Sequence, residues 1–118
     1  MTRKTLIIGG ASGIGFAVAR ALAARGDAII LAGRNKEKLN AARARLSPSP
    51  ASVETLVLDI SNEAEVIALS ETLGEVDNII VTAGSQAPGG PLSSLDPGAA
   101  RLAFDTKFWG SIDVARSL

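Results

Sequence analysis

The chain has 118 residues, with 12 basic and 12 acidic side chains, so its formal net charge at pH 7 is zero. This length fits one domain, and an apolar content of 47% provides a core of ordinary size, which excludes a disordered chain. The balanced charge predicts no nucleic-acid partner. Because Cys and His are both absent, the sequence offers no disulfide, no thiolate nucleophile, no Cys-ligated metal and no His, the commonest ligand of transition metals. We predict no metal site.

The apolar segments are short. The first one, Leu6 to Ile8, leads directly into glycines. It resembles neither the core of a signal peptide nor the roughly 20 apolar residues of a membrane span. We therefore expect no membrane partner and a cytoplasmic location, with which the absence of Cys is compatible.

The first half of the chain predicts two units of a strand followed by a helix. Residues 5–8 are apolar and β-branched, as in a strand buried within a parallel sheet. From Gly13 the apolar spacing becomes helical, and Gly26 predicts the left-handed residue that ends this helix. Residues 28–32 predict the second strand, after which Asn35 caps a helix that stops at a Ser-Pro-Ser-Pro segment.

Two more strands are predicted, at residues 53–58 and 76–81. Between them, Asn62 and Glu65 have the spacing of a capping box, which predicts one helix that ends before Gly74.

A glycine- and proline-rich loop follows the fourth strand. Asp96 and Pro97 then predict the start of a final helix that runs to the C-terminus. Four strands that alternate with helices, without hairpin signals, predict the α/β class. The expected architecture is a doubly wound parallel sheet of the Rossmann type with flanking helices.

A glycine-rich loop joins the first strand to the first helix. Glycines let a backbone turn sharply and approach a ligand, while the free amides at a helix start attract a pyrophosphate. At the carboxyl end of a strand in a doubly wound sheet, this pattern favours nucleotide binding over a purely structural turn. The predicted binding residues in the loop are Gly9, Ala11, Ser12, Gly13, Ile14 and Gly15.

The spacing Gly-x-x-x-Gly-x-Gly in this loop resembles that of the short-chain dehydrogenase/reductases. The resemblance extends along the chain through Leu58-Asp59-Ile60, Val76-Asp77, Ala83-Gly84 and residues 104–110. It implies an NAD(P)-dependent oxidoreductase that acts on a small carbonyl or alcohol. It also implies that Asp59 and Ile60 lie near the adenine, and Ala83 and Gly84 near the adenosine ribose.

The end of the second strand indicates which cofactor is bound. An acid at this position accepts hydrogen bonds from the ribose 2′-hydroxyl of NAD, but here Gly33 is followed by Arg34 and Asn35. Arg34, with Lys36 and Lys38 nearby, suits the 2′-phosphate of NADP. We predict NADP rather than NAD. The alternative is that these cations are only the solvated start of a helix.

The chain also departs from the pattern of the family. Catalysis in the family needs a Ser, a Tyr and a Lys four residues after the Tyr, and this chain has no Tyr. The resemblance therefore implies that residues 1–118 are the cofactor-binding half of a longer fold, truncated before its later strands and inactive alone. Lys107 occupies the position of the family's catalytic Asn, which leaves open an altered proton relay or a merely solvated side chain.

Two further positions differ next to the expected cofactor. Ile8 replaces the usual Thr, and Val81-Thr82 replaces a pair of Asn residues, so we expect weaker hydrogen bonds bracing the sheet there.

The last helix has an aromatic and apolar stripe that includes Phe104, Phe108 and Ile112. Packing of these side chains on the sheet is one expectation. The other is a subunit interface that includes Trp109, which is the role of this helix in the family. We therefore expect a homo-oligomer, formed through the last helix or through the open edge of the fourth strand.

The leading functional prediction is thus an NADP(H)-dependent oxidoreductase of which this chain is the cofactor half. The alternative is a non-catalytic nucleotide-binding module that needs a partner chain, which the fold alone does not exclude.

Overall fold

A four-stranded parallel sheet forms the centre of the protein in a computed structural model that describes residues 2–46, 52–83 and 89–118. The order of the strands is β3-β2-β1-β4, so that β1 lies inside the sheet and β3 and β4 lie at its edges. The strands are β1 (Lys4–Ile8), β2 (Ala28–Gly33), β3 (Val53–Val57) and β4 (Asn78–Val81). The predicted doubly wound parallel sheet is confirmed.

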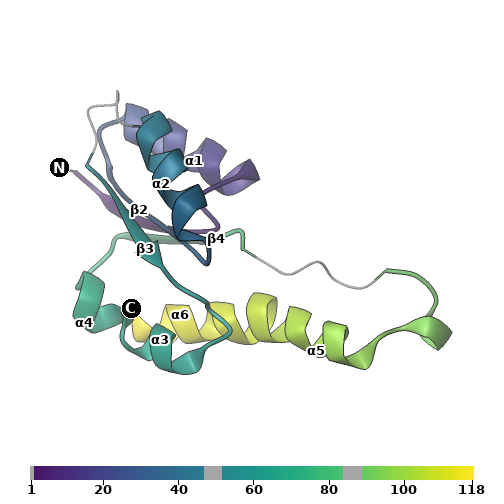
Figure 1. The fold of residues 1–118 in the computed structure, drawn as a ribbon. Coiled ribbons are helices and arrows are strands. Elements are labelled where there is room, and N and C mark those ends of the chain that lie inside the picture. Colours follow the sequence, from purple (N-terminus) through teal and green to yellow (C-terminus); the bar gives the residue numbers. More distant parts are fainter. Residues whose placement is uncertain (1, 47–51, 84–88) are drawn as a thin grey trace.

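Helices lie on both sides of the sheet (Figure 1). One layer consists of α1 (Gly13–Ala24) and α2 (Lys36–Leu46). The other layer contains α3 (Glu63–Ile67), α4 (Leu69–Leu73), α5 (Pro97–Phe104), the π-helical segment η2 (Asp105–Gly110) and α6 (Ser111–Ser117), with the short 3₁₀ turn η1 (Leu92–Ser94) before α5. None of the helices in the described part of the chain is long and apolar enough to cross a membrane.

The predicted helix caps are present. Asn35 Oδ1 accepts a hydrogen bond from the Lys38 amide at 3.0 Å, and Asp96 Oδ1 accepts one from the Gly98 amide at 2.9 Å. Gly26 ends the first helix with φ +86°, a conformation that glycine adopts without steric cost. These features are local in sequence, which is why the pattern predicted them.

The single helix predicted between Asn62 and Gly74 is wrong, because the structure divides it into α3 and α4 at Ala68. There ψ is −8°, away from the roughly −42° of a regular α-helix. The Ala68 carbonyl accepts a bond from the Thr72 amide at 3.2 Å and a second one from Thr72 Oγ1 at 3.1 Å, and such a second bond from a Thr side chain often bends a helix. The Asn62 cap itself is present, since its Oδ1 accepts from the Glu65 amide at 3.3 Å.

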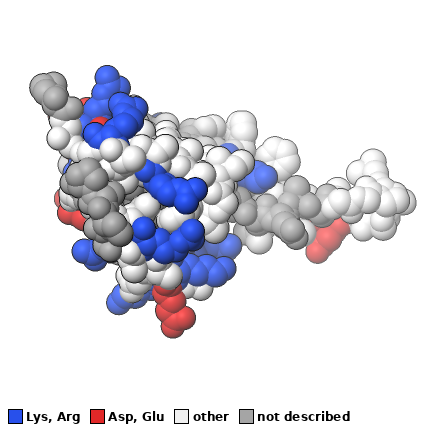
Figure 2. Space-filling model, turned by 90° about the horizontal axis from the view of Figure 1, so that it is seen from above, with Lys and Arg blue, Asp and Glu red and all other residues white. Residues whose placement is uncertain are grey.

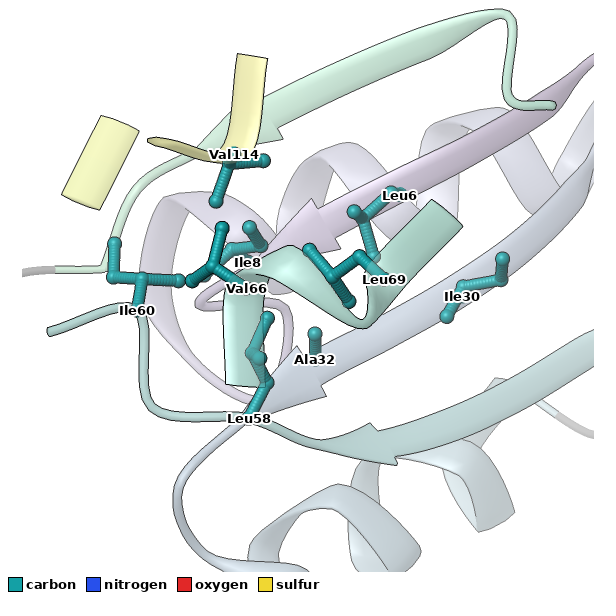
Figure 3. Close-up of a cluster of buried hydrophobic side chains, with 9 residues drawn as sticks. All are labelled: Leu6, Ile8, Ile30, Ala32, Leu58, Ile60, Val66, Leu69 and Val114. Atoms are coloured by element: carbon teal, nitrogen blue, oxygen red, sulfur yellow. The ribbon is translucent and has the colours of Figure 1, made fainter. Parts of the chain in front are cut away.

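Each face of the sheet has its own hydrophobic cluster. The cluster in Figure 3 joins side chains of the sheet and its following loops to Val66, Leu69 and Val114 of the helices α3, α4 and α6. The second cluster packs α1 and α2 on the opposite face through residues such as Phe16 and Leu39. Burial on both faces explains why the strands are almost entirely apolar.

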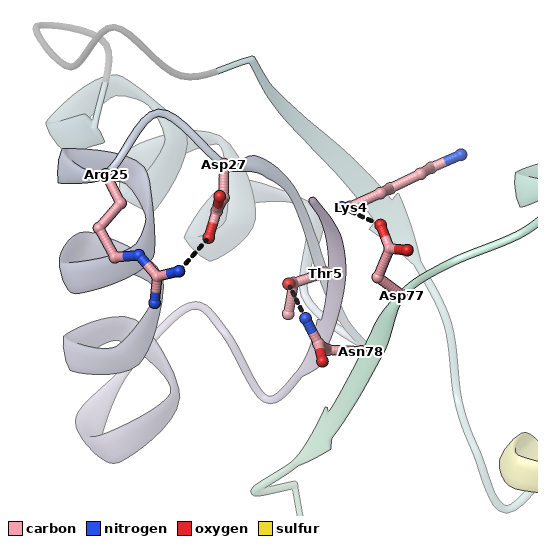
Figure 4. A network of polar contacts seen from close by, with 6 residues as sticks. All are labelled: Lys4, Thr5, Arg25, Asp27, Asp77 and Asn78. Atoms are coloured by element: carbon pink, nitrogen blue, oxygen red, sulfur yellow. Dashed lines mark hydrogen bonds and ion pairs between the residues drawn. The ribbon is translucent and has the colours of Figure 1, made fainter. Parts of the chain in front are cut away.

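Polar contacts at the amino end of the sheet fix the register between β1 and β4 (Figure 4). The Lys4 amide donates to Asp77 Oδ2 at 2.7 Å, and Asn78 Nδ2 donates to Thr5 Oγ1 at 3.2 Å. Thr5 is completely buried, so this bond satisfies a hydroxyl that would otherwise lack a partner in the core.

The aromatic residues of the last helical segments point away from the core. Phe104 is 62% exposed, Phe108 49% and Trp109 55%, and Ile112 is also exposed. The expectation that Phe104, Phe108 and Ile112 pack on the sheet is therefore wrong. The buried residues are Ala103, Gly110 and Val114 instead. They also recur at helical spacing, so this second stripe, and not the aromatic one, packs on the sheet.

Candidate functional site

A cleft of about 820 Å³ opens at the carboxyl ends of the strands. Loops that follow all four strands contribute to it, as does one residue of η2. This is the edge at which doubly wound sheets bind their ligands. Its lining residues are Ile8, Gly9, Ala11, Ser12, Ala32, Gly33, Arg34, Asn35, Lys36, Glu37, Lys38, Leu39, Leu58, Asp59, Ile60, Ala83 and Thr106.

The glycine loop is packed too closely for larger residues. Gly9 has φ +94°, and a Cβ added to it would lie 2.6 Å from Thr82 Oγ1 and 2.7 Å from the Ala83 amide nitrogen. A Cβ on Gly15 would lie 2.2 Å from the Gly9 carbonyl oxygen. Since real contacts are never this short, glycine is required at both positions for the helix to begin directly beside the strand.

The start of α1 presents unpaired amides. Ser12 is extended at the N-cap and makes no side-chain cap bond, while Gly13 has φ +59° with open space around it. The first helical hydrogen bond runs from the Phe16 amide to the Ser12 carbonyl. The preceding amides of the first turn have no acceptor within the helix, which makes this end of α1 suited to an anion.

Thr82 connects the glycine loop to the end of β4. Its amide donates to the Ile8 carbonyl at 2.9 Å, and the Ala83 amide reaches the same oxygen at 3.1 Å. The Thr82 hydroxyl lies 3.3 Å from the Gly9 carbonyl oxygen and 3.4 Å from that of Ile8. One hydroxyl donates only one of these bonds at a time, so Thr82 braces the loop with a single, shared donor.

Cations dominate the part of the cleft that follows β2. Arg34 comes directly after the strand, and Lys36 and Lys38 begin α2. Glu37 also lines the cleft, but it lies in the first turn of α2 rather than at the end of the strand. The side chain of Asn35 caps α2, so its oxygen already has a partner.

Asp59 lies on the opposite wall, after β3. Its Oδ1 accepts from Ser61 Oγ at 2.6 Å and from the Ser61 amide at 3.0 Å. The Ser61 hydroxyl is the main reason that the pKa of Asp59 falls below its usual value, and the positive charge of Arg34 lowers it further against the opposing effect of burial. Asp59 therefore remains a charged acceptor at neutral pH.

The cleft brings together most of the residues predicted from the sequence. Eight of them line it: Gly9, Ala11, Ser12, Arg34, Asn35, Asp59, Ile60 and Ala83. Gly13, Ile14 and Gly15 form the adjoining first turn of α1, where the Ile14 side chain is 74% exposed. Gly84 lies outside the described residues.

The last helical segment contributes one residue to the lining of the cleft. Lys107 is exposed and does not line the cleft, whereas its neighbour Thr106 does. The sequence did not indicate Thr106, because the aromatic stripe is the more apolar face of this segment. Thr106 lies three residues after Ala103 and four before Gly110, on the face that packs on the sheet. The Thr106 hydroxyl donates to the Leu102 carbonyl at 3.2 Å, so it already has a bond within the helix.

Comparisons with known proteins agree with this geometry. A family profile described as short chain dehydrogenase matches residues 3–118. The 1-deoxy-11-beta-hydroxypentalenate dehydrogenase of Streptomyces avermitilis is 32% identical over 117 residues, which cover 95% of this chain and 43% of the relative. An uncharacterized oxidoreductase of Staphylococcus aureus is 40% identical over 89 residues, or 71% of this chain and 38% of the relative. The chain thus spans less than half the length of these relatives.

Solved structures match in the same way. A short-chain type dehydrogenase/reductase from Mycobacterium ulcerans superposes with a TM-score of 0.89 at 30% identity, covering 98% of this chain and 44% of the other. A short chain dehydrogenase from Escherichia coli CFT073, complexed with NADPH, superposes with a TM-score of 0.92. The two chains are 23% identical, and the match covers 98% of this chain and 51% of the E. coli chain. At this level of identity, the similarity supports the fold alone. From its sequence, its fold and the glycine loop at its cleft, this chain belongs to the short chain dehydrogenase family.

Proposed function

We propose that this chain is the cofactor-binding half of an NADP(H)-dependent oxidoreductase that moves hydride between the cofactor and a small carbonyl or alcohol. The main support is the cleft, in which a tightly packed glycine loop, Arg34 and Asp59 face one space. Family membership and a structural neighbour complexed with NADPH agree with this function.

The residues of the cleft fit a nicotinamide dinucleotide. The free amides at the start of α1 suit its pyrophosphate, and the glycines leave room for that group against the backbone. The charged carboxylate of Asp59 suits the adenine amino group, and Ala83 lies where the adenosine ribose is expected. When bound, the cofactor supplies the hydride chemistry, and the role of this chain is to hold and orient it.

The choice of NADP over NAD rests on Arg34. Its guanidinium offers a fixed set of donors for a phosphate, and Lys36 and Lys38 add positive charge beside it. Glu37 is the nearby acid, but it lies within α2 and is outnumbered by these three cations. We expect NADPH to bind more tightly than NADH.

The chain by itself is expected to bind cofactor without turnover. It contains no Tyr, and the family uses a Tyr–Lys pair to move the proton. The absence of Tyr equally favours the second candidate, a non-catalytic nucleotide-binding module. NADPH oxidation by the chain with a panel of carbonyl compounds would contradict both the expected inactivity and the module.

The test of the proposed function is a calorimetric or fluorescence titration, with Trp109 as the only tryptophan donor. We expect saturable binding of NADPH, weaker binding of NADH, and a loss of about 1.5–3 kcal/mol of NADPH affinity in Arg34→Gln, since hydrogen bonds to charged groups are worth that much. Arg116→Gln is the matched control, because it removes the same charge from α6, outside the cleft.

The two variants also separate the ways in which the proposal could fail. If Arg34→Gln weakened NADPH and NADH equally, the nucleotide site would stand and the 2′-phosphate assignment would be wrong. If the folded chain bound neither cofactor, the proposed function would be rejected.

We also propose that the chain forms a homo-oligomer. The exposed aromatic face formed by Phe104, Phe108 and Trp109 supports this, as does the position of β4 at an edge of the sheet. The rings contact one another, with the centroids of Phe108 and Trp109 5.0 Å apart in an edge-on arrangement. Large exposed apolar patches and open strand edges are both typical of surfaces that join chains.

A further inference from the structure

The charges of this neutral chain are distributed unevenly. Residues 2–46 hold nine of its 12 basic side chains and two of its 12 acidic ones, Asp27 and Glu37. The other half of the chain has the opposite excess. The basic residues of the first part are Arg3, Lys4, Arg20, Arg25, Arg34, Lys36, Lys38, Arg43 and Arg45.

The fold places much of this excess on one layer. Because α1 and α2 cover one face of the sheet, their basic side chains form a basic face, and Glu37 is the acid of α2 among them. The basic face is made of Arg20, Arg25, Lys36, Lys38, Arg43 and Arg45. Figure 2 looks down on this layer and shows Lys and Arg side chains gathered over it. The acids of α3, α4 and α6, such as Glu63, Glu71 and Asp113, lie on the opposite layer.

The positive charge of the basic face is largely uncompensated. Arg25 makes the one ion pair found in residues 2–46, 52–83 and 89–118, with Asp27 at 3.8 Å. The guanidinium carbons of Arg45 and Arg20 lie 4.1 and 5.8 Å from the centre of the Phe16 ring, a contact that positions them without neutralising them. Arg43 is exposed on α2.

The basic face is continuous with the cleft. Lys36 and Lys38 belong to both, and Arg43 follows Lys36 by seven residues, which is about 10 Å along a helix axis. A charge at that distance acts through the solvent, since the Debye length is about 8 Å at physiological ionic strength and about 30 Å at 0.01 M salt. Arg43 lies outside the residues that line the cleft. Its charge therefore attracts the cofactor during approach but makes no contact with the bound cofactor.

We infer that the basic face steers the anionic dinucleotide into the cleft and thereby raises its association rate. This inference rests on the proposed function, because the steered ligand is the cofactor. A one-signed surface beside a cleft increases the encounter rate of a ligand of opposite charge. NADPH and NADH share the pyrophosphate, and the additional 2′-phosphate makes NADPH the more negative of the two, so the effect is larger for NADPH.

The test is stopped-flow binding of NADPH to the chain, followed by energy transfer from Trp109. Rates are measured at about 0.01 M and about 0.15 M ionic strength, where screening is weak and strong. We expect the association rate constant to fall as salt rises, and to fall more steeply for NADPH than for NADH. At low salt, Arg43→Gln is expected to lower the association rate constant of NADPH about two-fold, and Arg43→Glu is expected to lower it further. The dissociation rate constant is expected to stay unchanged in both variants.

Arg116→Gln is the matched control, because it makes the same change in net charge on the opposite layer. We expect the association rate constant of Arg116→Gln to equal that of wild type. If Arg43→Gln and Arg116→Gln lowered the rate equally, or if the rate did not depend on salt, steering would be overturned while the cofactor site stood. If the folded chain showed no saturable NADPH binding at either salt concentration, both the steering and the proposed function would be overturned.

Discussion

At the scale of single residues, the cleft depends on close backbone contacts rather than on many side chains. The Gly15 Cα lies so near the Gly9 carbonyl that the two positions exclude any side chain, and the Thr82 hydroxyl reaches the same carbonyl. Thr82 thus holds the loop that presents the amides of α1. It acts through the backbone of that loop, as a positioning residue.

We predict that Thr82→Val weakens NADPH binding and lowers the free energy of unfolding by about 0.5–1.5 kcal/mol, the typical net value of one hydrogen bond. The Val side chain keeps the shape of Thr but lacks the hydroxyl. Thr82→Ser is expected to restore cofactor affinity, because it retains the donor. Urea unfolding and NADPH titration measure the two quantities, and equal affinity in both variants and wild type would contradict the positioning role.

At the scale of elements, the π-helical η2 provides the residue of the last helical segment that lines the cleft, Thr106. Gly110 at its end lies against the loop after β3, where an added Cβ would lie 2.8 Å from the Ile60 carbonyl oxygen and 3.0 Å from that of Asp105. Neither neighbour is a flexible side chain. The close packing of this helix on the sheet, and with it the position of Thr106, depends on this glycine.

We predict that Gly110→Ala lowers the free energy of unfolding by about 1–3 kcal/mol, the cost of overpacking a close contact. Gly98→Ala is the control within the same helical run, since its Cβ would lie 3.4 Å from Asp96 Oδ1. Alanine has the higher helix propensity, so Gly98→Ala is expected to be neutral or stabilising. Chemical denaturation of both variants makes the comparison, and equal midpoints would show that the helix moves to accommodate the added methyl group without cost.

Local features of the fold could be predicted from the sequence, and features that depend on distant contacts could not. The caps at Asn35 and Asp96 involve residues two or three positions apart, so a short pattern reveals them. The break at Ala68 and the π turn of η2 interrupt segments whose apolar spacing is helical throughout. The position of the cleft could be predicted from the alternation of strands and helices. The contribution of Thr106 depended on which of two helical stripes packs on the sheet, and the more apolar aromatic stripe is not that one.

At the scale of the whole molecule, two unpaired surfaces remain. One is the free edge of β4, and the other is the aromatic face of Phe104, Phe108 and Trp109. The rings of the aromatic face pack against one another, with the centroids of Phe104 and Phe108 6.3 Å apart. A second copy of the chain would remove these rings from water.

We predict that Phe108→Asp shifts the chain toward monomer in sedimentation velocity, because a carboxylate in a buried apolar contact costs several kcal/mol unless it is paired. Leu92→Asp is the matched control, since Leu92 is exposed outside this face. If both variants associated as wild type does, the edge of β4 would become the proposed contact. A wild-type chain that stayed monomeric at all concentrations would contradict self-association.

The central position of β1 has a consequence for the synthesis of the protein. Its partner β4 follows β2 and β3 in the chain, and the contact of Thr82 with Gly9 joins residues 73 positions apart. Contacts of such high sequence separation form slowly, because a long loop must close before they are gained. The glycine loop therefore acquires the wall formed by Thr82 and Ala83 only after residues 82 and 83 have left the ribosome, so during synthesis the loop exists before its nucleotide cleft does.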